Sequence, residues 1–195
     1  QYRDGTTDIT RTVAVGDVPD AAKFAFTLVL KGMIGISRLR FPDTLAGRDI
    51  DALARAPLWA AGLDYDHGTG HGVGSYLSVH EGPQRLSRAS HEVLRPGMIL
   101  SNEPGYYREG AFGIRIENLI AVREAPPIEG ADDRAMLFFE ALTLAPIDRN
   151  MIKPELLNAS ERHWLDSYHG RVERSLSEHC SEATRRWLRG ACKPL

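Results

Sequence analysis

The spacing of apolar and polar positions changes from alternating to helical along the first forty residues. Over Thr6–Val15, one set of alternate positions carries Asp8 among three threonines, and the other set includes isoleucine and valine. This period of two predicts a β-strand. Asp17 and Pro19 then suit the cap and the first turn of a helix. Apolar residues over Ala21–Leu39 recur at the spacing of one helix face.

A second helix is predicted from about Arg48 to Ala61, after a break at Phe41-Pro42-Asp43. Pro57 lies inside this helix and is expected to kink it or to mark its end. The following segment, Tyr65–Gly82, is rich in glycine and histidine, which indicates a loop that leads into a strand.

Three β-like runs follow a turn signal at Pro96-Gly97; they are Met98–Asn102, Gly113–Val122 and Leu137–Leu144. From Pro154 onward the apolar positions return to a helical spacing. We therefore expect an α+β fold, in which a helix pair lies between β-segments and a helical extension follows at the C-terminal side.

Composition narrows the class of protein. The 195 residues are 43% hydrophobic and 26% charged, which is average for a globular domain. The longest apolar stretch, near Phe24–Leu30, is far shorter than the ~20 residues that span a bilayer, so we expect no membrane segment. A net charge of −2 disfavours a general nucleic-acid surface. Residues 1–148 are acidic and residues 149–195 are basic, which predicts a domain boundary between them.

A scattered set of hard-metal ligands carries the candidate chemistry: Asp8, His71, Glu103 and Glu117. Carboxylates are rare in apolar strands unless they are paired or bind a cation. One histidine with several carboxylates favours Mn²⁺, Co²⁺, Zn²⁺ or Fe²⁺ over the metals that thiolates select. Taken singly, Asp8 could lie on a solvated face, and Glu117 could pair with Arg115 or Arg123 at the surface.

Longer motifs around these residues resemble the aminopeptidase P family, the Xaa-Pro aminopeptidases among the pita-bread metallopeptidases. The resemblance covers nearly the whole chain, is closest to the cytosolic type, and rests on three stretches: Asp4-Gly-Thr-Thr-Asp8-Ile-Thr-Arg-Thr12, His67-Gly-Thr-Gly-His71-Gly-Val-Gly74 through His80-Glu-Gly-Pro83, and Asn102-Glu103-Pro-Gly-Tyr-Tyr107 through Ile114-Arg-Ile-Glu117-Asn118.

The resemblance implies a metal centre and its residues. Asp8 and Glu117 would bridge two divalent metal ions, typically Mn²⁺, while His71 and Glu103 would complete the shell of one ion. Glu103 would also move the proton of the water held between the ions. The remaining roles are those of pocket-lining or orienting residues, namely His67 and His80 against the substrate and Arg115 beside a carboxylate.

The implied reaction is hydrolysis of the bond between an N-terminal residue and a following proline by a hydroxide that two metal ions activate. Three alternatives stay open: prolidase, which cuts Xaa-Pro dipeptides; a pita-bread binding module without catalysis; and an enzyme of the creatinase type, which lacks the metals.

The chain begins at Gln1 without a methionine, and the resemblance places one further aspartate ligand upstream of Gln1. We therefore expect a pita-bread domain that is incomplete at its N-terminal side. The expected partner is the N-terminal portion of the same protein or a second copy in a homodimer. The two cysteines form no disulfide framework, which fits a cytoplasmic location.

Overall fold

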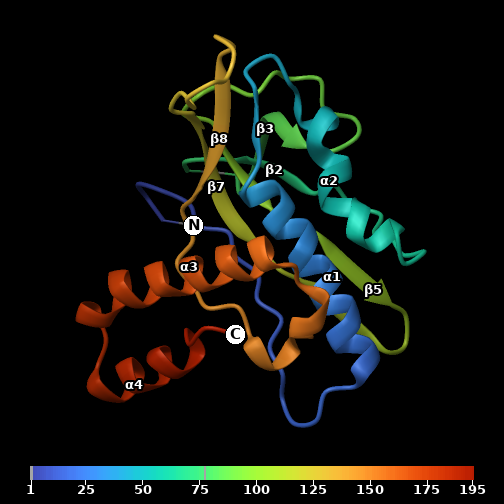
Figure 1. Ribbon diagram of the computed structural model, residues 1–195, viewed down its shortest axis with the longest axis vertical. Coiled ribbons are helices and arrows are strands. Elements are labelled where there is room, and N and C mark those ends of the chain that lie inside the picture. The colour runs from blue at the N-terminus through green and yellow to red at the C-terminus, as the bar shows by residue number, and fades with distance from the viewer. Residues whose placement is uncertain (1, 77) are drawn as a thin grey trace.

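The computed structural model describes residues 2–76 and 78–195, and an antiparallel sheet lies at its centre (Figure 1). Within these residues the sheet has six strands, in the order β1 (Arg40–Pro42), β8 (Met136–Ala141), β7 (Asn118–Glu124), β4 (Ile99–Asn102), β2 (Gly70–Val73) and β3 (His80–Leu86). A separate hairpin pairs β5 (Gly105–Arg108) with β6 (Phe112–Arg115).

Helix α1 (Asp20–Ser37) crosses the face of the sheet, with α2 (Gly47–Trp59) beside it (Figure 1). The C-terminal part contributes α3 (Ala159–Leu176) and α4 (Glu182–Ala191), with short 3₁₀ turns at Arg149–Met151, Pro154–Leu156 and Ser177–His179. Among the helices of the described residues, none combines the length and the apolar character needed to cross a membrane.

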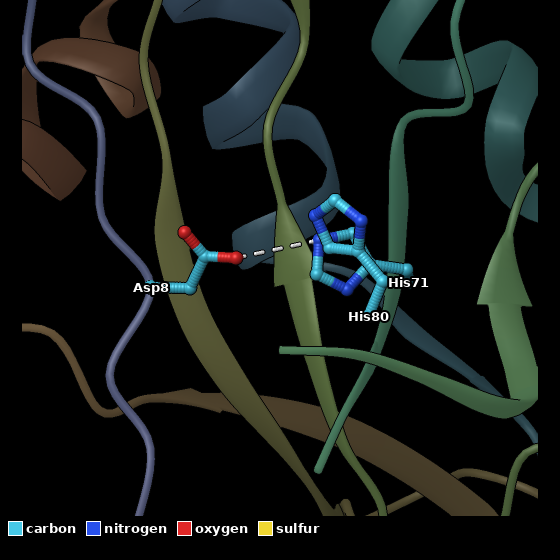
Figure 2. Close-up of side chains that lie close together, drawn as sticks. All are labelled: Asp8, His71 and His80. Carbon is cyan, nitrogen blue, oxygen red and sulfur yellow. Dashed lines mark ion pairs between the residues drawn. The ribbon is translucent and has the colours of Figure 1, made fainter. Parts of the chain in front are cut away.

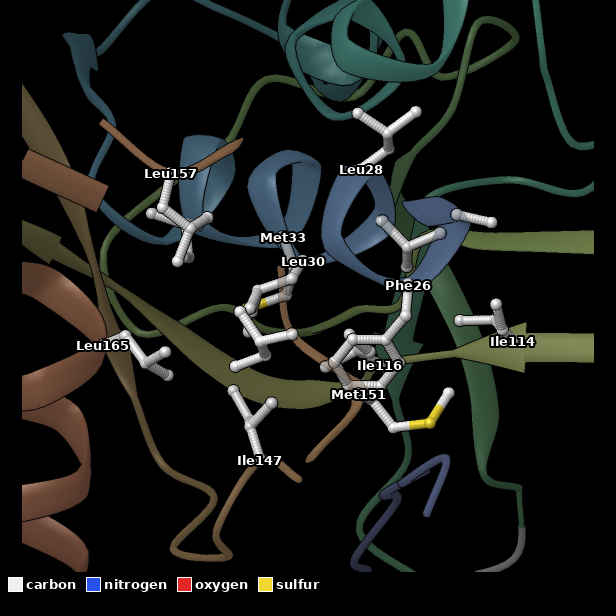
Figure 3. Packing of buried hydrophobic residues seen from close by; sticks show 14 of the residues in the cluster. Phe26, Leu28, Leu30, Met33, Ile114, Ile116, Ile147, Met151, Leu157 and Leu165 are labelled. Carbon is white, nitrogen blue, oxygen red and sulfur yellow. The ribbon is translucent and has the colours of Figure 1, made fainter. Parts of the chain in front are cut away.

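Two hydrophobic clusters hold these layers together. The end of α1 and the inner face of α2 pack on the sheet, where Ile36 and Ile50 meet Leu100, Ile120 and other apolar strand residues. The remainder of α1 lies in a second cluster with the β5–β6 hairpin and with α3 and α4 (Figure 3). Helix α1 is therefore buried on nearly all sides, as its long apolar run requires.

The C-terminal residues belong to the same packing. Leu165, Val172 and Leu188 are buried in the cluster that contains Phe26 and Met33 of α1. Asn158 caps α3 by accepting a hydrogen bond from the Glu161 amide, which fixes where the helix begins. A domain boundary after residue 148 stays a prediction.

Most predicted elements are confirmed. Both early helices form close to their predicted bounds, and Pro57 is tolerated inside the last turns of α2. The runs at Met98–Asn102 and Leu137–Leu144 form β4 and β8, and the tail is helical. Helix α1 ends at Ser37, before the predicted break, and Phe41-Pro42 belongs to the short edge strand β1.

The prediction of a β-strand over Thr6–Val15 is wrong. The segment is extended, but within the described residues its one backbone hydrogen bond to the strand region beside it runs from the Glu117 amide to the Thr10 carbonyl. Side chains supply the other links, namely the hydroxyls of Thr10 and Thr12, the Arg11 guanidinium and the Asp148 carboxylate. Side-chain hydrogen bonds replace a ladder here. The run Gly113–Val122 is also two strands, because Ile116 and Glu117 interrupt it between β6 and β7. Strands β2 and β5 fall where no strand was predicted.

A close crossing of α1 and α2 gives a first prediction, since a Cβ at Gly32 would lie 2.1 Å from the Ala54 carbonyl oxygen. Gly32→Ala should force the two helices apart and lower the free energy of unfolding by about 2 kcal/mol in urea titrations. Gly190→Ala in α4 is the control, because the space around Gly190 is open. That change should stabilise the chain by up to about 1 kcal/mol. Equal effects of the two changes would contradict the close-crossing argument.

Buried His169 on α3 predicts a pH dependence. Its Nε2 accepts a hydrogen bond from the Ile147 amide at 3.0 Å, and burial together with Arg149 lowers its pKa to about 4. The unfolded chain takes up this proton below about pH 6.5, whereas the folded chain does so only near pH 4. The free energy of unfolding should therefore fall by about 3 kcal/mol over that window.

The matched variant is His169→Gln, which offers an amide oxygen in place of Nε2 and does not titrate. Urea unfolding at steps between pH 7 and pH 4 should show a flatter profile for this variant than for the original chain. Parallel profiles would refute the assignment of this pH dependence to His169.

Candidate metal centre

The predicted ligands come from neighbouring elements at one place in the fold. His71 lies in β2, Glu103 directly follows β4, and Glu117 directly precedes β7. These three strands are adjacent in the sheet, in the order β7, β4, β2. Asp8 reaches the same place from the extended N-terminal segment (Figure 2). The fold therefore gathers residues that are separated by more than a hundred positions in sequence.

The distances are those of a compact ligand cluster. His71 Nε2 lies 3.0 Å from Glu103 Oε1 and 3.5 Å from Asp8 Oδ2. Ligand atoms of His71, Glu103 and Glu117 all lie within 4.8 Å of one another, and the same holds for Asp8, His71 and His80. All four predicted metal ligands are thus brought together, while their roles as ligands stay predictions.

The orientation of the His71 ring indicates what it faces. Its Nδ1 lies 2.9 Å from the Gly72 carbonyl oxygen, and since that oxygen only accepts, Nδ1 carries a proton. In the neutral ring Nε2 is then a bare lone pair directed at two carboxylates. Burial opposes charging of His71, but the contacts with Glu103, Gly72 and Asp8 outweigh it and raise its pKa. A proton or a cation at Nε2 resolves the repulsion.

Glu117 is the most deeply buried of the carboxylates, with 1% of its surface exposed. Thr10 Oγ1 donates to Glu117 Oε2 at 2.6 Å, whereas Oε1 has no hydrogen-bond partner among the described residues. Burial raises the pKa of Glu117 to about 7; Glu103 and Asp8 add to this rise, and the Thr10 hydroxyl opposes it. An orphaned carboxylate oxygen beside two other carboxylates fits a divalent cation.

Glu103 is held in its charged form. Ser101 Oγ donates to Glu103 Oε1 at 2.9 Å, and the Arg115 guanidinium lies 3.3 Å from Oε2. Burial alone would raise the pKa of Glu103, but His71, Ser101 and Arg115 together lower it. The contact of Arg115 with a carboxylate agrees with the orienting role predicted for this residue.

The predicted pocket histidines lie beside the cluster. A cavity of about 350 Å³ is lined by His67, His71, His80, Glu103 and Arg115, among others. The exposed His80 ring packs edge-on against His71, with centroids 4.1 Å apart (Figure 2). His67 Nε2 lies 2.9 Å from the Tyr107 hydroxyl. The cavity thus opens onto His71 and Glu103 of the cluster.

Sequence reasoning missed Tyr107 as a site residue. Its hydroxyl accepts a hydrogen bond from Arg115 Nε at 2.8 Å while it contacts His67, so it links a pocket histidine to the partner of Glu103. Tyr107 and Arg115 meet because they lie on the paired strands of the β5–β6 hairpin. No strand was predicted at β5 from the sequence, so this contact had no signal in the sequence pattern.

A buried ionic network behind the cavity was also missed. Arg55 and Asp51 form an ion pair at 2.7 Å inside α2, with 4% and 1% of their side chains exposed. Arg55 donates to the carbonyls of Tyr65 and His67 at 2.7 Å each, and Asp51 accepts from Thr69 Oγ1 at 2.6 Å. The network therefore fixes the loop that presents His67 and leads into β2.

Two profiles of one peptidase family match this chain. The sequence profile of metallopeptidase family M24 matches residues 1–124, and the profile for the C-terminal region of peptidase M24 matches residues 135–195. A "Probable Xaa-Pro aminopeptidase P" of Paracoccidioides brasiliensis (strain Pb03) is 47% identical over 200 residues, and one of Talaromyces marneffei is 48% identical. Each match covers 100% of this chain, but 32% and 30% of the relatives. The chain thus spans about a third of the length of the curated relatives it matches.

Solved structures of related enzymes are also similar to this chain. An X-prolyl aminopeptidase from Caenorhabditis elegans, described as a cytosolic enzyme with a di-nuclear active site, is 43% identical with a TM-score of 0.91, over 98% of this chain and 32% of its own. An Xaa-Pro dipeptidase from Bacillus anthracis is 34% identical with a TM-score of 0.58, over 73% of this chain and 36% of its own. These likenesses confirm the predicted α+β pita-bread fold, of which the chain holds a part.

The Asp51–Arg55 pair gives a prediction for the loop behind the cavity. Asp51→Asn removes the charge that offsets a buried guanidinium, so the free energy of unfolding should fall by about 3 kcal/mol. Glu182→Gln breaks an exposed i,i+4 pair with Arg186 and should cost less than about 0.5 kcal/mol. Urea unfolding of both variants compares the two pairs. Similar small losses would show that the buried pair does not hold this loop.

Proposed function

Because the chain belongs to metallopeptidase family M24, we propose that it is the C-terminal part of the catalytic region of a metal-dependent Xaa-Pro aminopeptidase. The observation that carries the proposal is the His71 lone pair directed at Glu103 and Asp8, beside the orphaned oxygen of Glu117. The lone pair and the orphaned oxygen are atoms that bind cations, and without a cation few nearby groups would offset the repulsion among the carboxylates.

Asp8, His71, Glu103 and Glu117 would hold two divalent cations between them. Two bound ions would supply an activated water and polarise the scissile carbonyl. The hard, oxygen-rich donor set favours Mn²⁺, with Zn²⁺, Co²⁺ or Fe²⁺ as alternatives. A further carboxylate for one of the ions would come from the part of the protein that precedes Gln1.

The chain's own side chains would handle protons and substrate. Glu103, held charged by Arg115 and Ser101, is the base that accepts a proton from the attacking water. His67 and His80 line the cavity and would steady the peptide carbonyl as negative charge develops on it. Tyr107 holds His67 in place through its hydroxyl.

The substrates would be peptides with proline in the second position. An Xaa-Pro bond has a tertiary amide nitrogen that carries no N–H, so an enzyme for it must grip other parts of the peptide. The cavity histidines would meet this requirement by steadying carbonyl oxygens of the peptide. The relatives named as Xaa-Pro aminopeptidases support this substrate class.

Prolidase is the second candidate, since the dipeptidase structure shares the fold and the identity is well above chance. Two observations favour the aminopeptidase. The aminopeptidase structure covers 98% of the chain and the dipeptidase 73%, and the named relatives match the chain from end to end.

The remaining parts of the proposal concern location and assembly. We place the protein in the cytoplasm, which agrees with the description of its nematode neighbour as a cytosolic enzyme. Its partner would be the N-terminal portion of the same protein or a second copy in a homodimer. Residues 1–148 would form the metallopeptidase part and residues 149–195 the helical extension.

The test uses the full-length protein that contains this chain, loaded with Mn²⁺. It should release the first residue of an Xaa-Pro-Yaa tripeptide faster than it cleaves an Xaa-Pro dipeptide. Glu103→Ala should lower kcat at least about 100-fold, because it removes both a metal ligand and a base. Glu140→Ala is the control, since Glu140 lies on β8 in an exposed pair with Arg123 and should keep full activity.

Each result decides between the candidates. Preference for the dipeptide would favour prolidase. If the Mn²⁺-loaded protein cleaved neither peptide, the remaining candidate would be a pita-bread binding module without catalysis. Near-normal turnover by Glu103→Ala would refute the role given to Glu103.

A further inference from the structure

Arg11 ties the N-terminal segment to the body of the fold. Its guanidinium donates to the carbonyl oxygens of Glu117 (2.5 Å), Ala145 (2.9 Å) and Pro146 (3.0 Å), and to Asn118 Oδ1 at 2.6 Å. Its remaining long-range partner is the Tyr168 hydroxyl, 2.9 Å away on α3. One side chain thus joins the segment that carries Asp8, the start of β7, the linker after β8 and the C-terminal helix.

These contacts decide where Asp8 lies relative to Glu117. The segment that carries Asp8 forms no strand ladder, and Thr12 and Ala14 anchor its far end, so the contacts nearest to Asp8 are those of Thr10 and Arg11. Thr10 pairs with Glu117 through its hydroxyl and its carbonyl, while Arg11 holds the Glu117 carbonyl and Asn118. A shift of Arg11 would move Asp8 and Glu117 relative to each other.

Tyr168 is placed to hold Arg11 from the C-terminal side. Its ring stacks on Trp164, with centroids 5.2 Å apart and planes 6° apart. Its hydroxyl accepts from Arg11, so its own proton is free to go to the Ala145 carbonyl at 2.9 Å or the Thr143 carbonyl at 3.1 Å. Packing and hydrogen bonds together leave the hydroxyl little freedom.

A purely structural role at this position would not require the guanidinium of Arg11. Within the described part of the chain, no carboxylate lies within salt-bridge distance of Arg11; its partners are neutral groups. Arg11 is half-buried, and taking a guanidinium partly out of water without an ion pair is costly, whereas apolar residues of similar volume often stabilise a fold as well or better. The guanidinium adds directional hydrogen bonds, because its planar set of N–H donors holds several backbone carbonyls at once.

We propose that Tyr168 and Arg11 are positioning residues for the metal centre, through which helix α3 holds Asp8 against Glu117. The inference rests on the proposed function, because it requires that these two carboxylates bind cations together. It assigns the C-terminal extension a part in building the site, although α3 contributes no ligand.

The test replaces Tyr168 with phenylalanine in the full-length protein. Tyr168→Phe keeps the ring and its stack on Trp164 and removes only the hydroxyl. His169→Gln, the next residue on the same helix, is the matched control, because its buried hydrogen bond goes to Ile147 and not to Arg11. Mn²⁺ affinity is measured by calorimetry, and the coupling between two Mn²⁺ ions by electron paramagnetic resonance.

Tyr168→Phe should bind the second Mn²⁺ ion roughly 10-fold more weakly and lose part of the spin-coupled signal, while His169→Gln keeps both. Arg11→Lys, which keeps the charge but not the planar set of donors, should weaken the second ion further. Wild-type affinity and coupling in Tyr168→Phe, with or without a lower melting temperature, would overturn the proposal, as would an original protein that binds fewer than two ions. Two bound ions without cleavage of Xaa-Pro peptides would refute the proposed function and leave the positioning role intact.

Discussion

Electrostatic repulsion among gathered carboxylates is the constraint on which the rest of this structure depends. Asp8, Glu103 and Glu117 lie around one histidine, and Glu117 is almost fully buried. Negative charges at such spacing repel strongly where water is scarce. Burial and this repulsion raise the pKa of Glu117 to about 7. The attraction of the same carboxylates for a charged ring helps to raise the pKa of His71, although burial opposes it. The scaffold must therefore hold these groups in place against forces that would separate them.

The scaffold does so in two different ways. Adjacent strands β7, β4 and β2 place Glu117, Glu103 and His71 through ordinary ladder hydrogen bonds, which leave little freedom. Asp8 lies on a segment without a ladder, and side-chain hydrogen bonds replace one there. The buried Asp51–Arg55 pair plays the same part for the loop of His67. Polar side chains thus fix the irregular parts of the site, where an unpaired polar group would lower the stability of the fold most.

Sequence periodicity predicted the parts of the fold that depend on local pattern. The apolar spacing of α1 and the β-runs at β4 and β8 require little knowledge of their neighbours. Alternation over Thr6–Val15 revealed an extended backbone, but it could not show that hydroxyls would take the place of a partner strand. The candidate ligands were predicted because their residue types and motifs resemble those of a known family. Arg55 was missed because a charged i,i+4 pair in a helix usually lies at the surface, and only tertiary packing buries it.

The C-terminal extension illustrates why site residues cannot be separated from the core that surrounds them. Helix α3 buries Leu165 and Val172 in the same cluster as α1, so its position is set by apolar packing. That packing also fixes Tyr168, whose hydroxyl meets Arg11 one residue from the Thr10–Glu117 contact. A helix with no predicted ligand of its own is therefore two hydrogen bonds away from the backbone of Glu117, whose carboxylate is buried. Because packed interiors transmit small displacements, apolar contacts on α3 bear directly on the geometry of the metal centre.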